Sequence, residues 1–269
     1  MVQDLYLPVM EPHEIESVLV GLPLVVDVPL FVDFVKGFPR RYLARTPKLE
    51  IVKHFLLAMN LGDKRVITSL AEETKRWKLS VITRDRSFLF ARISGTLSCF
   101  KMNILAAEAF ANAHGIVLDT LYFEDLEERF RGATERQQFQ VLLEDVVSGD
   151  RELEPVLEQQ WPDIHTWHEE HLEVHFDNQT HPRATVMRVH CRDRFGLLYL
   201  ISHFLSEAGY SIDMAYIQTS HHEADDEFYL TREGRKLESA EIDDLAQAFS
   251  SFRVPQFREQ GQDPYAEEG

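Results

Sequence analysis

Two charged tripeptides of the same composition recur along the chain and are the residues best placed to bind a small ligand. The sequence Arg-Asp-Arg stands at positions 84–86 and again at 192–194, at an offset of 192 − 84 = 108. Each copy separates a strand-like run from a helix-like run. A helix N-terminus presents unpaired backbone N–H groups and the positive end of the helix dipole, so such a turn attracts an anion. A free amino acid would place its carboxylate there and its ammonium on acidic or carbonyl groups. The residue types alone favour a simpler interpretation, a polar turn with an internal ion pair.

The residues that follow the two tripeptides differ in one respect. Gly196 follows the second copy, whereas Phe88 stands at the same place after the first. Glycine lets a ligand approach the backbone closely and adopts backbone angles that a side chain would penalise.

The elements that must position these turns are predicted to repeat in the same order. Apolar residues at period two predict a strand before each turn, and apolar residues at helical spacing predict a helix after it. Two strand-like runs and a second helix follow in each copy, at 103–111, 116–125 and 134–149, and at 211–220, 225–232 and 238–251. This order predicts an α+β fold of two ferredoxin-like βαββαβ modules.

The boundaries of these units follow from the same patterns. We expect an α-helical N-terminal segment at 1–75, a first module with its linker at 76–180, a second module at 181–255 and a disordered tail at 256–269. The closing strand of the first module is expected in "LEVHFDN" from Leu172. Only "FRVPQF" remains to close the second, and Pro255 restricts it to an edge strand.

Composition limits the partners. The chain has 269 residues, with 28 Lys and Arg against 45 Asp and Glu, so its formal charge of −17 argues against nucleic acid and anionic membranes as partners. Cys99 and Cys191 fit a reducing compartment and core packing rather than a disulfide. No apolar run has the form of a signal peptide or membrane span, so we expect a cytoplasmic protein.

Two clusters invite a metal interpretation, which the spacing does not favour. The first cluster comprises His221, His222, Asp225 and Asp226, and the second comprises His165, His168, His171 and His175. The first falls where the repeat places a hairpin, and Asp226 there matches Asp119 of the first copy. The second lacks the His-Glu-x-x-His spacing of zinc enzymes. No nucleophile elbow or phosphate loop is present. We therefore predict no metal, no cofactor and no catalytic residue.

The repeated segments resemble the strand, loop and helix signature of ACT domains, which are small ligand-binding modules. The segments "GFPRRYLARTP", "LEVHFDN" and "DDEFYLTREGRKL" are similar, in this order, to the C-terminal region of the bifunctional PII uridylyltransferase/uridylyl-removing enzymes. The similarity runs from about Phe34 to Leu237. The resemblance implies two ACT modules that sense glutamine. It also implies a sensory part without catalysis, because the residues before Phe34 leave no room for the family's nucleotidyltransferase and HD domains.

The resemblance also implies where a ligand binds. Family glycines are kept as Gly196 and Gly209, whereas the first module has Phe88 and Lys101 at the matching places. The predicted ligand contacts are Asp193, Arg194, Phe195, Gly196, Leu197, Leu198, Ser211 and Asp213. A weaker candidate site comprises Asp85, Arg86, Ser87, Phe88, Leu89 and Asn103.

The resulting prediction is a non-catalytic regulatory protein that binds glutamine or a similar small amino acid. The resemblance implies a protein partner in nitrogen regulation, and the modules are expected to pair within one chain or in a homodimer. Two alternatives stay open: a structural interaction module without a ligand, and the detached regulatory part of a split uridylyltransferase.

Overall fold

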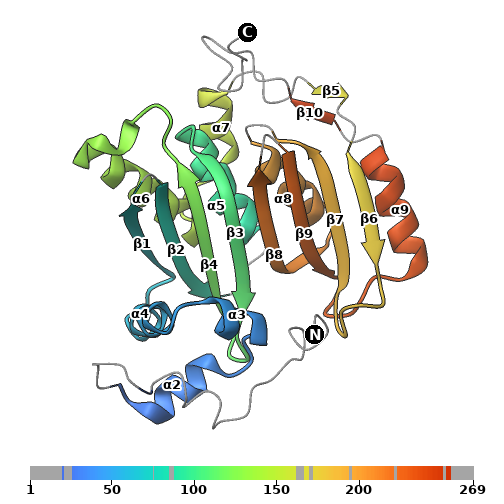
Figure 1. Ribbon diagram of the computed structural model, residues 1–269. Coiled ribbons are helices and arrows are strands. Elements are labelled where there is room, and N and C mark those ends of the chain that lie inside the picture. The colour runs from blue at the N-terminus through green and yellow to red at the C-terminus, as the bar shows by residue number, and fades with distance from the viewer. Residues whose placement is uncertain are drawn as a thin grey trace.

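One antiparallel sheet of eight strands organises the protein, with helices on both of its faces (Figure 1). The computed structural model describes residue 20 and residues 26–74, 76–84, 88–161, 167–169, 172–193, 196–220, 223–250 and 253–255. The strand order is β1-β2-β4-β3-β8-β9-β7-β6, and all neighbours pair antiparallel. The predicted α+β class with ferredoxin-like modules is confirmed.

The two halves of the sheet contain the same succession of elements. The first half comprises β1 (Val66–Glu73), β2 (Arg76–Arg84), α5 (Leu89–Cys99), β3 (Asn103–Ala111), β4 (Ile116–Glu124), a 3₁₀ turn η2 (Arg129–Arg131), α6 (Ala133–Ser148) and α7 (Glu154–Gln160). The second half comprises β6 (Glu173–Asp177), β7 (Thr185–Arg192), α8 (Leu197–Glu207), β8 (Ser211–Ser220), β9 (Glu223–Thr231) and α9 (Ser239–Ser250). Helix α8 begins 108 residues after α5 begins and ends 108 residues after α5 ends, which is also the offset between the charged tripeptides.

The edge strands differ from the prediction. Residues 66–73, which we assigned to the helical segment, form β1 and make a hairpin with β2 through the turn at Thr74. "LEVHFDN" does not close the first half, because β6 pairs with β7 of the second. Each edge position is thus filled by the first strand of its half, which a short connection places beside the second strand. The strand around Pro255, β10 (Arg253–Pro255), pairs outside the main sheet with β5 (Trp167–Glu169).

A helical N-terminal layer packs on one face of the sheet, as predicted for this part of the chain. It comprises α2 (Val28–Val35), α3 (Arg40–Arg45) and α4 (Lys48–Met59). Its buried aromatic side chains contact apolar residues of β2, β3, β4, β7, β8 and β9. Lys78 of β2 is 7% exposed, and its Nζ lies 2.5 Å from Oε2 of Glu50 on α4. Burial opposes ionisation of Glu50, but hydrogen bonds from Lys53 and Lys78 outweigh it and lower its pKa to about 2.

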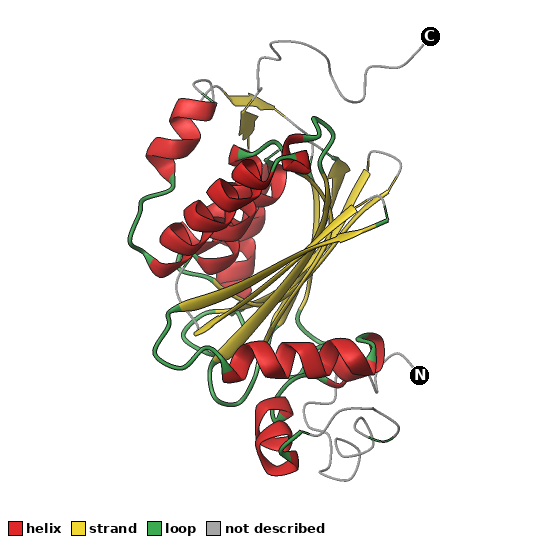
Figure 2. Ribbon diagram, turned by 90° about the vertical axis from the view of Figure 1, so that its left-hand side faces the viewer, coloured by secondary structure: helices red, strands yellow, loops and turns green. Residues whose placement is uncertain are grey.

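The opposite face carries the larger core and joins the two halves. Helices α5, α6 and α8 cover this face, and Figure 2 shows the sheet nearly edge-on with helices gathered to its left. Gly95 of α5 permits close packing, because an added Cβ would lie 2.7 Å from Cδ2 of Tyr199 on α8. The hydroxyls of Ser94 and Ser202, 108 residues apart, approach to 3.5 Å between these helices. On the sheet, β3 pairs with β8, for example Ala109 with Ala215.

Among the described residues, no helix combines the length and apolar character that crossing a membrane requires.

Candidate functional site

Asp193 and the start of α8 lie against the first half of the protein. The residues around this position, called the second-loop site below, are Asp193, Gly196, Leu197, Leu198, Ser98, Met102, Asn103, Ile104, Ile217, Thr219 and Asp226. The first four come from the turn and start of α8, whereas Asn103 begins β3 of the other half. The space between them has a volume of about 20 Å³. This is room for about one water molecule, which needs roughly 10–15 Å³.

The start of α5 faces a much larger space, called the first-loop cavity below, with a volume of about 810 Å³. Its lining includes Phe88, Leu89, Phe90, Ala109, Ala111, Asp119, Ser206, Tyr210, Ser211 and Ile212, together with Asp213 and Thr231. The first ten are the counterparts, at an offset of 107 or 108, of residues that line the second-loop site. The two positions are therefore equivalent in construction. They differ in volume because the first-loop cavity also extends to Lys36, Gly37 and Pro39 of the helical layer and to His181 and Arg183.

Each position combines the turn of one half with a strand of the other. We predicted Ser211 and Asp213 beside Gly196, and the structure places both in the first-loop cavity. Asn103, predicted with the first turn, lies at the second-loop site. The cause is the antiparallel pairing of β3 with β8, which brings the start of each strand to the other half's turn. The remaining predicted contacts, Asp85, Arg86, Ser87, Arg194 and Phe195, lie outside the described residues.

Both helices begin with a residue in the left-handed backbone region. Gly196 has φ 77° before α8, and Phe88 has φ 62° before α5. Their carbonyls accept the first helical bonds, from Leu200 N at 3.1 Å and Arg92 N at 2.8 Å. Neither residue caps its helix with a side chain. Phe88, which stands at the place that matches Gly196, therefore adopts the same turn. The left-handed conformation costs about 1–2 kcal/mol for a residue with a side chain.

A buried carboxyl group at each position was not among the predicted contacts. Asp226 of β9 is 3% exposed and Asp119 of β4 is 1% exposed. Burial raises the pKa of Asp226 to about 8, against a hydrogen bond from Gln218 N, and the charges of Asp193 and Asp225 raise it further. The sequence contained the signal for these residues, since Asp119 and Asp226 stand at matching places in the two copies.

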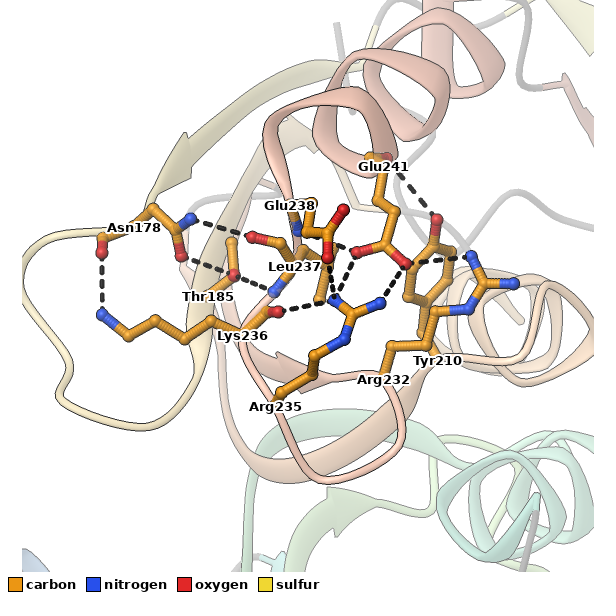
Figure 3. A network of polar contacts seen from close by, with 9 residues as sticks. All are labelled: Asn178, Thr185, Tyr210, Arg232, Arg235, Lys236, Leu237, Glu238 and Glu241. Atoms are coloured by element: carbon orange, nitrogen blue, oxygen red, sulfur yellow. Dashed lines mark hydrogen bonds and ion pairs between the residues drawn. The ribbon is translucent and has the colours of Figure 1, made fainter.

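A polar network joins the segment after β9, the start of α9 and the loop before β7 (Figure 3). Arg232 and Tyr210 meet Glu241 at the start of α9, at 3.2 Å from Nη1 to Oε1 and 3.5 Å from the hydroxyl to the backbone carbonyl. Arg235 donates two hydrogen bonds to the same carboxylate, at 2.8 and 3.0 Å. Lys236 Nζ bonds the carbonyl of Asn178 at 2.8 Å. The segment "REGRKL" thus attaches α9 to the loop before β7, and Tyr210 of this network lines the cavity.

The histidine-rich segments lie mostly outside the described part of the chain, which includes neither His221 and His222 nor His165 and His171. Asp225 is described, and its Oδ1 lies 2.7 Å from Nδ1 of His190. Within the described residues, no three His, Cys, Asp or Glu side chains are grouped so that they could hold a metal ion.

Comparison with known proteins finds relatives among the bifunctional uridylyltransferase/uridylyl-removing enzymes. No protein-family model matches the chain. A bifunctional uridylyltransferase/uridylyl-removing enzyme from Rhodospirillum rubrum is 30% identical over 197 residues, which are 70% of this chain and 21% of the relative. The enzymes of the same name from Azospirillum brasilense and Phenylobacterium zucineum are 27% and 26% identical, over 72% and 79% of this chain. The matched part spans about a fifth of the length of each of these relatives. The predicted resemblance is thereby confirmed: the chain is similar to one segment of the bifunctional uridylyltransferase/uridylyl-removing enzymes.

Proposed function

We propose that this chain is a non-catalytic regulatory protein that binds a small amino acid between its two halves. The observation that carries the proposal is the first-loop cavity, whose volume of about 810 Å³ lies in the range of small-molecule sites. It combines the start of α5, where backbone N–H groups favour a carboxylate, with the carboxyl groups of Asp119 and Asp213, which suit an ammonium group. Glutamine is the proposed ligand because of the resemblance to the uridylyltransferase family.

The position of the cavity supports a regulatory role. Its walls come from β3, β4 and α5 of one half and from β8 of the other. A ligand held there contacts both halves, so its affinity depends on how they pack. A ligand shifts a conformational equilibrium only by its difference in affinity for the states. The proposed output is a changed contact with a protein partner, a PII-like protein or an enzyme that acts on one.

The second-loop site is the alternative position for the amino acid, as expected from Gly196. At about 20 Å³ it would have to open before a free amino acid could enter. Its lining residues come from both halves, so such an opening would separate α8 from the start of β3. Because the second-loop site would have to open first, the first-loop cavity is the favoured position for the amino acid.

Thermal unfolding of the full chain with each of the twenty amino acids, followed by calorimetry, tests the proposal. A ligand at 100 times its dissociation constant should stabilise the protein by about 2.7 kcal/mol. We expect Ser211→Phe, which projects an aromatic ring from the wall of the first-loop cavity, to abolish the effect of glutamine. Gly196→Phe is the matched variant, because it copies Phe88 into the second turn.

The outcomes separate the alternatives. Loss of binding in Gly196→Phe alone would move the ligand to the second-loop site. No response to any amino acid would contradict the proposal and leave a structural interaction module. A separately encoded nucleotidyltransferase that requires this chain for activity would identify the regulatory part of a split enzyme.

A further inference from the structure

The second-loop site is too small for an amino acid, yet its lining is polar. Its volume of about 20 Å³ suits a single particle of the size of water. The carboxyl groups of Asp193 and Asp226 line this space, together with Asn103 and Thr219, and Asp193 is only 9% exposed. Within the described part of the chain, no basic side chain lines it. A site of this size with several oxygen acceptors favours a small hydrogen-bond donor.

Asp226 is the group in this site whose placement most needs an explanation. Only 3% of the surface of this residue is exposed. In the described part of the chain it has one hydrogen bond, from Gln218 N to Oδ1 at 3.3 Å, and no ion pair. Burying a carboxylate without a cation is costly, so the acid holds its proton instead. The charged groups that act on it are Asp193, from the turn before α8, and Asp225, from its own strand, and both disfavour ionisation.

The same carboxyl group occurs in the other half. Asp119 of β4 is 1% exposed and lines the first-loop cavity at the position that matches Asp226. A buried acid at two equivalent positions, each facing a space between the halves, is a feature of the site rather than of one strand. An acid kept neutral by burial becomes a strong cation acceptor when a cation arrives.

We propose that the second-loop site binds an ammonium group, which takes the place of the proton on the carboxyl group of Asp226. The proton passes to solvent, and the carboxylate that remains accepts hydrogen bonds from the ammonium N–H groups. Asp193, Asn103 and Thr219 supply further oxygen acceptors. The ammonium group is that of the free ammonium ion, which is close to water in size. This proposal does not depend on the proposed function, because it requires no amino acid.

The test uses the full chain and two isosteric variants. Asp226→Asn removes the acid at the second-loop site, and Asp119→Asn makes the same change at the first-loop cavity. Thermal unfolding is followed with ammonium chloride, potassium chloride or choline chloride at equal ionic strength. Proton release is measured with an indicator dye in weak buffer on addition of ammonium chloride or glutamine. Glutamine binding to Ser211→Phe is measured in parallel.

We expect ammonium, and not choline, to raise the unfolding temperature of the wild type and of Asp119→Asn, with release of up to about one proton per chain at pH 7. The apparent dissociation constant should fall about tenfold from pH 6 to pH 7, because the proton competes for the same carboxyl group. Asp226→Asn should show neither effect. Proton release by glutamine and not by ammonium chloride would overturn the proposal, because the occupant would then be an amino acid.

Three further results would overturn it: an equal response to potassium, an unchanged response in Asp226→Asn, or binding without proton release. Failure of the proposed function would be a different result: the wild type would show no glutamine binding that Ser211→Phe could remove.

Discussion

The buried acid in the second-loop site should give this protein an unusual dependence of stability on pH. Asp226 has a pKa of about 8 in the folded chain, against 3.8 for an exposed aspartate, because burial disfavours its charged form. Between these two values the folded state holds a proton that the unfolded state has lost. The contribution of this group to the free energy of unfolding is therefore greatest below about pH 4 and is lost as pH rises through about 8.

The size of the effect follows from the shift. Each pH unit inside the window changes the free energy of unfolding by about 1.4 kcal/mol, so the step from pH 5 to pH 8 amounts to about 4 kcal/mol as an upper bound. Asp226→Asn keeps the shape of the side chain and removes the titration. The wild type should lose stability relative to the variant by this amount over the same interval.

Urea unfolding of both proteins at half-unit steps from pH 5 to pH 8 measures the difference. Burial lowers the pKa of His54 and His181 to about 4, and both groups add stability as pH rises from 4 to 6.5. These contributions are the same in the wild type and the variant, so they cancel in the comparison. Parallel curves for the two proteins would refute the assignment of a neutral buried acid at this position.

Three further predictions concern packing. Gly37→Ala should lower the free energy of unfolding in urea by several kcal/mol, because an added Cβ would lie 2.3 Å from the backbone nitrogen of Ala113 and φ is +93°. The control Gly62→Ala, where φ is +47° and the space is open, should lower it by about 1 kcal/mol. Equal losses in the two variants would contradict the clash at Gly37. Gly95→Ala should cost about 1–3 kcal/mol by the same measurement, since its Cβ would overlap side chains of α8 and of the loop before α7, and an unchanged midpoint would show that the helices can separate freely. Cys99 should not react with a thiol reagent in the native state, because burial raises its pKa to about 12, and it should react fully once the protein is unfolded in urea; rapid native reaction would place it at the surface.

Much of the fold could be predicted because the local patterns are strong. The helix between Leu89 and Cys99 and the hairpin that turns at Gly115 follow from apolar spacing and turn residues, and both are present. The edge strands could not be placed in this way. Residues 66–73 lack a clear alternation of buried and exposed side chains, since most are partly exposed at the sheet edge. Which strand fills an edge is decided by tertiary pairing rather than by local sequence.

The candidate site was predictable in its turns but not in its grouping. The charged tripeptides and Gly196 identify the helix starts, because those signals are local. The exchange of Asn103 and Ser211 between the two positions depends on the pairing of β3 with β8, which no short segment of sequence encodes. The buried acids were visible as a match between copies, but their pKa depends on surroundings that only the folded chain provides.

The crossed construction means that neither half owns a complete pocket. A movement of one half relative to the other would therefore alter both pockets at once, although their volumes differ, at about 810 Å³ and 20 Å³. A substitution within one half would change only that half's share of each wall.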